Sequence, residues 1–458
     1  MLPKPPPEFK TTYDRACALF HEGKDDEGNR EMAKACRLSP EAWIGIGCAL
    51  MKKGDSELAI RRFEEAAHMA KGRPQTRAIA LNNLGMMLAN TGERGRSAPM
   101  FDEAVKLYPQ YADGWSNKSL VHKWHGELAA ALDCIHKSLK FNPWHGQAEF
   151  TRALILLMGG NFKEGWPAYE SRWRIQEGTL RKLEVPYPEW DGTNHQPGQR
   201  LLIYAEQGMG DTIQMLRYVP QLKALGLKLS FTVQLPLMSL LATTGWFTEL
   251  FAIGEPVRCF DLQVPIFSLP RILQQFSEDD LPCTPYLTAP KPMNWGPGFH
   301  VGIVWRGNKA HKNNPWRTSK LTDWRPLLET PGATFHQLQV GEGLEELDEF
   351  PQVVRHSLPR DFLETANRMA GMDLIITIDT SIVHLAGAMG LPVWMLTPVG
   401  PDFRWQLDRP DSPWYPTLKL FRQAKEFDWS DVMKLMTKTL NETIHSPNAQ
   451  PLGMVLRP

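Results

Sequence analysis

A glycine-rich loop with two acidic side chains is the first segment whose residues could do chemistry. It reads Tyr204-Ala-Glu-Gln-Gly-Met-Gly-Asp211 and lies between a strand-like apolar run and a helix-like stretch. Glycines allow a tight turn and close backbone approach, and a new helix presents free N–H groups to a ligand. The loop lacks the third glycine of a dinucleotide fingerprint, and Asp211 at its mouth disfavours a diphosphate. We therefore predict a site for a neutral acceptor, although a simple strand-to-helix turn would also explain Gly208 and Gly210.

A second candidate site follows a buried apolar strand that ends near residue 378. Asp379 comes directly after that strand, Thr380 or Ser381 can cap the next helix, and His384 lies one turn further on. Ligands of open α/β sheets bind at the carboxyl ends of strands, and a helix N-terminus favours phosphate oxygens. The pattern therefore predicts a site for a phosphate-bearing ligand. The competing interpretation is structural, with hydroxyls that only cap the helix and a histidine that belongs to the core.

A basic loop follows another strand candidate. Between Arg306 and Lys320 it contains five Lys or Arg residues and His311. A departing diphosphate needs such positive charge, because negative charge develops on it in the transition state. A run of charges can equally be a solvated surface, so this loop supports the diphosphate hypothesis only together with its position at a strand end.

The elements expected to carry these loops alternate between strands and helices, which is typical of an α/β architecture. A proline-rich stretch from Pro282 to Pro297 separates two halves, which we predict as two Rossmann-like domains facing a cleft. Their expected bounds are 199–290 and 298–442, after a linker at 176–198 and before a tail at 443–458. The strand candidates are Arg200–Ala205, Leu229–Gln234, His300–Trp305, Thr334–Gln339, Asp373–Ile378 and Pro392–Leu396, and the helix candidates are Thr212–Leu225, Leu363–Met369, Ile382–Met389 and Trp429–Asn441.

The first third of the chain repeats itself. The stretch that begins at Trp43 recurs from Leu81 and again from Trp115, at steps of 38 and 34 residues. Each copy offers small residues where helices approach and larger ones that fill the gap. The pattern resembles the tetratricopeptide repeat, a pair of interlocking antiparallel helices, and about five units fit residues 8–175. Such arrays form concave surfaces for peptides or partner proteins, and Trp166 and Trp173 are placed to pack on the domain that follows.

Composition excludes several classes of protein. Lys plus Arg and Asp plus Glu both total 51, so no net charge favours nucleic acid or a membrane surface. No apolar run approaches the roughly 20 residues of a membrane span, and the first residues, MLPKPPPEFK, lack the apolar core of a signal peptide. Six scattered cysteines without a CxxC pair fit reduced thiols rather than disulfides or zinc. We therefore expect a cytoplasmic protein.

Four ordered blocks between residues 199 and 423 resemble one family. The blocks are EQGMGDTIQMLRYVP, VGIVWRGN, IDTSIVHLAGAMGLPVW and DSPWYPTLKLFRQ. They look like the signatures of glycosyltransferase family 9, the relatives of bacterial ADP-heptose:lipopolysaccharide heptosyltransferases, and in particular of its branch with N-terminal tetratricopeptide repeats. The resemblance implies a GT-B fold, a nucleotide-sugar donor, no metal or other cofactor, and inversion at the anomeric carbon. The chain also contains no Asp-x-Asp, the motif of metal-dependent sugar transferases.

The resemblance also implies roles for individual residues. Asp211 would be the catalytic base, and the loop around it would form the acceptor side. The basic loop departs from the branch's usual wording at Asn314 and Thr318, and Arg306 stands where a small residue is common, which bears on the identity of the donor sugar. The implied acceptor-side residues are Glu206, Gln207, Gly208, Gly210 and Gln214, and the implied donor-side residues are Asp379, Thr380, Ser381, His384, Lys312, Arg317 and Asn308.

Three functional hypotheses follow from these patterns. The first is an inverting, metal-independent sugar transferase with a glycan or protein acceptor, whose array binds the acceptor or a partner. The second is a protein O-glycosyltransferase in which the array delivers a polypeptide. The third is a scaffold whose transferase half has lost activity, against which the presence of Asp211, Thr380 and His384 argues.

Overall fold

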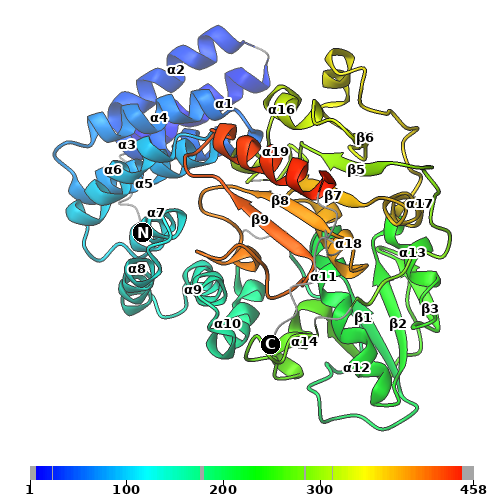
Figure 1. The fold of residues 1–458 in the computed structure, drawn as a ribbon. Coiled ribbons are helices and arrows are strands. Elements are labelled where there is room, and N and C mark those ends of the chain that lie inside the picture. The colour runs from blue at the N-terminus through cyan, green and yellow to red at the C-terminus, as the bar shows by residue number, and fades with distance from the viewer. Residues whose placement is uncertain (1–6, 23, 176–179, 283–284, 312, 446–458) are drawn as a thin grey trace. The chain divides into compact units, whose positions relative to one another are not determined.

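A computed structural model describes residues 7–22, 24–175, 180–282, 285–311 and 313–445 (Figure 1). The chain divides into two compact units, residues 1–151 and 152–458. The first is a helical array and the second holds two parallel β-sheets. None of the described helices is both long and apolar enough to cross a membrane.

The array consists of helices that pack in consecutive pairs, α1 with α2, α3 with α4, α5 with α6 and α7 with α8. The helix α9 (Gly146–Met158) crosses the boundary at residue 151, and α10 (Phe162–Tyr169) belongs to the second unit. The boundary between the two units therefore lies within the repeat region, which the sequence pattern predicts to end at residue 175. The bounds of the first eight helices are Pro7–His21, Asp25–Leu38, Pro40–Lys53, Ser56–Met69, Pro74–Asn90, Arg94–Leu107, Ala112–Trp124 and Leu128–Phe141.

A glycine and an aromatic ring hold each central pair together. A Cβ on Gly47 of α3 would lie 2.5 Å from Cε1 of Phe63 in α4, and one on Gly85 of α5 would lie 2.7 Å from Cε1 of Phe101 in α6. Both rings are fully buried. The absence of a side chain on the first helix thus lets the ring of the second lie directly against its backbone.

The second unit contains two sheets in which all neighbouring strands run parallel. The first has the order β3-β2-β1-β4 and the second the order β6-β5-β7-β8-β9. Within them Ile203 lies opposite Phe231, and Ile376 opposite Trp394. The strands are β1 Arg200–Tyr204, β2 Lys228–Val233, β3 Glu249–Ala252, β4 Leu262–Pro265, β5 Phe299–Val304, β6 Ala333–Gln337, β7 Leu374–Ile378, β8 Val393–Thr397 and β9 Leu418–Arg422.

Helices and tryptophans complete this unit. Seven of the 16 tryptophans of the chain are among the largest fully buried side chains of this unit. Trp166 contacts the rings of Trp414 and Phe403 at centroid distances of 6.2 and 6.1 Å, so the end of the repeat region packs on the α/β part as its aromatic residues suggest. The remaining helices are α11 Met209–Met215, α12 Val219–Ala224, α13 Met238–Ala242, α14 Leu269–Ile272, α15 Asn314–Arg317, α16 Arg325–Leu328, α17 Phe362–Met369, α18 Ser381–Ala388 and α19 Ser430–His445.

The sequence patterns located most of these elements but not all. Each of the six strand candidates overlaps an observed strand, whereas β3, β4 and β9 were not predicted. The predicted helix over Thr212–Leu225 is found but is divided, because the chain forms α11, a 3-10 turn at Leu216–Tyr218 and then α12. Pro220 sits at the start of α12, and proline is tolerated in the first turn of a helix but not in its interior.

The contact of Gly47 with Phe63 predicts how an added methyl group at residue 47 changes the stability of the array. Gly47→Ala should destabilise the array by about 1–3 kcal/mol, because overpacking outweighs the better helix propensity of alanine. Gly45 lies two residues earlier in the same helix, and apart from its chain neighbours and its own helix backbone no atom lies within 4 Å of its would-be Cβ. Gly45→Ala should therefore stabilise the array by up to about 1 kcal/mol. Urea unfolding followed by circular dichroism measures both, and equal effects of the two substitutions would contradict the packing argument.

Candidate functional site

Asp211 lies where the glycine-rich loop after β1 turns into α11. It is the third residue of that helix and not its N-cap, which is Gly208. The backbone N–H of Gly208 donates to Oδ2 of Asp211 at 2.9 Å. This bond fixes the carboxylate at the helix N-terminus and leaves its side chain 26% exposed.

Gly210 brings α11 of the first half against α18 of the second. A Cβ at this position would lie 2.7 Å from Cδ2 of His384 and 3.2 Å from Cα of Ser381. Any other residue would therefore push the two helices apart. The helices that follow β1 and β7 therefore meet near their N-termini.

The start of α18 is formed as the sequence predicts for a capped helix. The Thr380 hydroxyl accepts the N–H of Ile382 at 3.3 Å, and Ser381 is the first helical residue. His384 is buried, with its Nδ1 2.9 Å from the hydroxyl of Tyr415. Burial, with the charge of Arg404 nearby, holds the pKa of His384 well below its usual range, so the imidazole is neutral at physiological pH.

Arg404 joins the two halves through Asp211 and is the residue that the sequence patterns missed. It lies in the 3-10 turn Phe403–Trp405 after β8, and its side chain is 8% exposed. Its Nη2 donates to Oδ1 of Asp211 at 2.5 Å and its Nη1 to Oδ1 of Asp402 at 2.7 Å. Its Nε donates to the amide oxygen of the buried Gln214. The segment Pro401–Trp405 has no strong motif, so only its place after a strand end could have indicated it.

The pKa of Asp211 is set by burial and by charges from the second half of the unit. Burial raises the pKa of Asp211, and the charge of Arg404 with the N–H of Gly208 offsets this only in part. The carboxylate of Asp402, a second negative charge close by, raises the pKa of Asp211 further. A carboxyl with a raised pKa is a better proton acceptor once ionised.

Asp379 and Arg317 lie together on the donor side. Nη1 of Arg317 donates to the backbone carbonyl oxygen of Asp379 at 2.6 Å. Burial and the neighbouring carboxylate of Asp402 raise the pKa of Asp379 to about 6. Gly307 permits this position of Arg317, since a Cβ there would lie 3.0 Å from the Arg317 Nε.

Of the two remaining donor-side candidates, Asn308 is described and lies in a turn of its own. Asn308 is exposed, and its side-chain oxygen accepts the N–H of Ala310 at 2.9 Å in a local turn. Lys312 lies outside the described residues. Among the described residues of the basic loop, Arg317 is the cation that contacts Asp379.

Glu206 has a structural partner rather than an open position in the acceptor loop. Its two oxygens accept from Nε and Nη2 of Arg172 at 2.6 and 3.0 Å, and both side chains are completely buried. The N–H of Phe267 donates to the same carboxylate at 3.1 Å. Arg172 also donates to the Ser268 hydroxyl at 3.0 Å, so this pair ties the end of the repeat region to the first sheet.

The two glutamines of the acceptor-side loop also hold the framework. The Gln207 amide donates to the Tyr169 hydroxyl at 2.8 Å, and its backbone oxygen accepts from Gln234 at 2.7 Å. Gln214 binds Arg404, as described above. Gln207 and Gln214 therefore hold the framework around Asp211, and their side chains bond to other residues of the protein.

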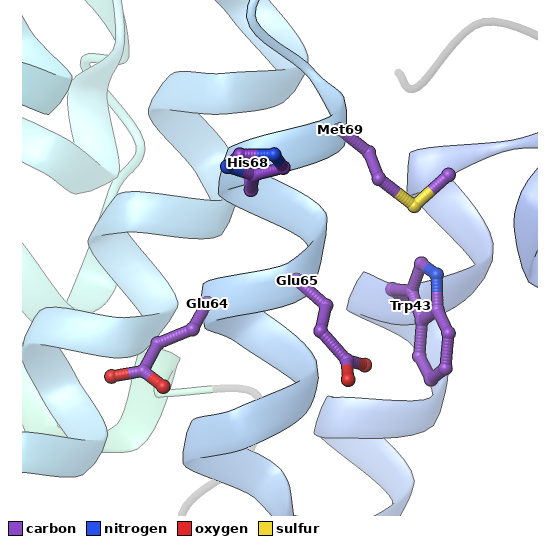
Figure 2. Close-up of a pocket in the computed structure, with 5 residues that line it drawn as sticks. All are labelled: Trp43, Glu64, Glu65, His68 and Met69. Carbon is purple, nitrogen blue, oxygen red and sulfur yellow. The ribbon is translucent and has the colours of Figure 1, made fainter.

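The array carries a separate hollow of about 400 Å³ (Figure 2). Trp43 of α3 lines one side and four residues of α4 line the other, namely Glu64, Glu65, His68 and Met69. The Met69 thioether lies above the Trp43 ring, and the Glu65 carboxylate points toward it. The hollow thus combines an apolar floor with acidic groups.

No group of three or more His, Cys, Asp or Glu side chains in the described parts of the chain is arranged to hold a metal ion.

No model of a known protein family matches the chain. Over 437 residues it is 29% identical to Protein FlbA of Caulobacter vibrioides, which covers 87% of this chain and 72% of that protein. Over 114 residues it is 24% identical to the tetratricopeptide repeat domain-containing protein PYG7 of Arabidopsis thaliana, covering 25% of this chain and 38% of that one. The helical array is tetratricopeptide-repeat-like, and the rest of the chain contains parallel-sheet α/β portions.

Two solved structures align with this chain at low TM-scores. An O-GlcNAc transferase mutant from Thermobaculum terrenum aligns over 88% of this chain and 86% of its own, at 14% identity and a TM-score of 0.34. A MamA fragment from Desulfovibrio magneticus aligns over 37% of this chain and 93% of its own, at 17% identity and a TM-score of 0.28.

The buried pair of Arg172 and Glu206 predicts a large loss of stability when one partner is removed. Arg172→Leu leaves the Glu206 carboxylate buried without its counter-charge and should cost about 3–5 kcal/mol. Arg355 pairs with Asp348 at 2.8 Å, but its side chain is 48% exposed. Arg355→Leu should therefore cost at most about 1 kcal/mol. Denaturant midpoints from tryptophan fluorescence measure both, and a loss of under 1 kcal/mol for Arg172→Leu would exclude a structural role of the pair.

Proposed function

We propose that the second unit is a glycosyltransferase, which moves a sugar from a nucleoside-diphosphate sugar to an acceptor hydroxyl with inversion and without a metal ion. The observation that carries this proposal is the meeting of Asp211 from the first half with the α18 N-terminus, Arg317 and Arg404 from the second. A displacement of this kind needs a carboxylate to remove the proton of the acceptor and positive groups to stabilise the charge of the leaving group. Asp211 and the cationic start of α18 would supply the two.

Asp211 takes the role of general base in this proposal. Its carboxylate lies at the edge of the α11–α18 contact, is partly exposed and has a raised pKa. A base works best when its pKa approaches the working pH, so burial of Asp211 favours this role. His384 lies beside the same contact but is neutral and buried, and it is better suited to shape the site than to exchange protons.

The donor diphosphate would bind at the start of α18. The free N–H groups of a helix N-terminus and the hydroxyls of Thr380 and Ser381 suit phosphate oxygens. Arg317 lies next to Asp379 at the same strand end, and its Nε has no hydrogen-bond partner among the described residues. These groups supply the positive charge that a metal ion provides in other sugar transferases.

The reaction is then a single displacement. The acceptor oxygen forms a bond to the anomeric carbon as the bond from that carbon to the phosphate oxygen breaks. The electron pair of the broken bond leaves on the nucleoside diphosphate, where Arg317 and the α18 N-terminus stabilise it. Asp211 receives the proton of the acceptor hydroxyl.

The array would bind the acceptor, a protein or glycan, or a partner protein. Its hollow at Trp43 offers an apolar floor that suits a peptide with an apolar side chain. The Glu64 and Glu65 carboxylates beside it pair with Arg96 at 3.6 Å and with Arg62 at 2.8 Å. A polypeptide acceptor would make the protein an O-glycosyltransferase. Labelled nucleotide sugar, followed into protein and glycan fractions, distinguishes the two acceptor classes.

The base assignment predicts the effect of Asp211→Asn. Asparagine keeps the size of the side chain and one hydrogen-bond acceptor but cannot take a proton, so turnover should fall about 10²–10⁴-fold. Donor affinity should be nearly unchanged, because the donor groups lie on the other half. Steady-state kinetics in the presence of EDTA measure both.

Asp211→Ala serves as the comparison, since it also removes the bond to Gly208. If Asp211 only supports the helix start, the Ala variant loses stability while the Asn variant keeps normal turnover. That outcome would end the base assignment.

A further inference from the structure

Arg404 is held in one orientation by contacts along its whole guanidinium group. Nη2, Nη1 and Nε each donate to a different side chain, respectively Asp211, Asp402 and Gln214. The group also lies over the ring of Phe403 at 4.4 Å from its centroid and near that of Phe267 at 5.8 Å. An arginine with this many contacts has little rotational freedom and can serve as a rigid support.

The carboxylate of Asp211 is consequently fixed from two directions. Oδ1 accepts from Arg404, which belongs to the second half, and Oδ2 accepts from the N–H of Gly208, which belongs to the first. Neither half alone can supply both bonds. The orientation of Asp211 therefore depends on the contact of α11 with α18.

We infer that Arg404 is the positioning residue of Asp211: it aims the carboxylate from the opposite half and keeps it ionised, so that the base is complete only when the two halves are in contact. This inference rests on the proposed function. Arg404 need not touch the substrate, because it acts through Asp211.

Two physical effects give this role measurable consequences. An opposite charge within a few ångströms lowers the pKa of a carboxyl by about 1–3 units, so removal of Arg404 should raise the pKa of Asp211. Misplacement of a reacting group by about 1 Å can cost about 10²-fold in rate. Loss of Arg404 should therefore change both the pH profile and the turnover number.

The test compares Arg404→Gln, Arg404→Lys and a matched control in the same loop. Arg404→Gln should lower kcat by about 10²-fold, leave the KM for donor within about threefold, and move the acid limb of the kcat profile up by about one pH unit or more. Arg404→Lys retains a charge and should recover part of both effects. Arg409 pairs with Glu278 and Asp411 at 2.8 Å without contacting Asp211, so Arg409→Gln should leave the acid limb in place.

A purely structural role of Arg404 predicts a different result. In that case Arg404→Gln would lower the melting temperature and reduce kcat equally at every pH, with no shift of the acid limb. That result would overturn the inference. A second decisive comparison is the double variant Asp211→Asn with Arg404→Gln, which should be no slower than Asp211→Asn alone, because both changes act on the same base.

A failure of the proposed function is separable from a failure of this inference. If the wild-type protein transfers no sugar from any nucleotide sugar, the proposed function is wrong. The pairing is then decided by denaturant midpoints of Asp211→Asn, Arg404→Gln and the double variant. Non-additive changes in the midpoint support a direct interaction of Asp211 with Arg404 across the two halves. Additive changes overturn that interaction.

Discussion

The candidate site depends on one close contact, that of Gly210 in α11 with Ser381 and His384 in α18. The strand ends of two separate parallel sheets lie close together only when the helices that follow those strands can touch. A glycine at the crossing point permits this contact, and the partly buried ion pair of Asp211 with Arg404 then spans it. In the proposed reaction, the base and the anion-binding groups therefore come from different halves of the chain.

The end of the repeat region contributes to the same arrangement. Trp166 packs on Trp414 and Phe403, the latter adjacent to Arg404, and Arg172 neutralises Glu206 in the loop that carries Asp211. A buried ion pair is costly to break and specifies a particular geometry more than it adds stability. The last helical segment thus acts as part of the α/β unit, which agrees with the division of the chain at residue 151.

The helices and strands of the candidate site could be predicted from the sequence more completely than the contacts between its residues. The strand ends at Tyr204 and Ile378 and the cap at Thr380 could be predicted, because apolar runs and capping residues are local signals. Arg404 could not, since its partner Asp211 lies almost two hundred residues away and nothing in its own segment marks it. Glu206 had the right type and place for a ligand-binding residue, but its pairing with Arg172 depends on how the repeat region packs. The short strands β3 and β4 were also missed, because four-residue strands with polar or proline positions are defined by their neighbours in the sheet.

Binding of nucleoside diphosphates by the full chain tests the central claim most directly. Isothermal titration with ADP, UDP, GDP, CDP and dTDP in EDTA should show one of them binding in a one-to-one complex. That binding should persist in Asp211→Asn and be lost in Arg317→Ala, because in this account Arg317 contacts the diphosphate and Asp211 contacts the acceptor. Binding of none of the five, or binding only after a divalent metal is added, would contradict the account.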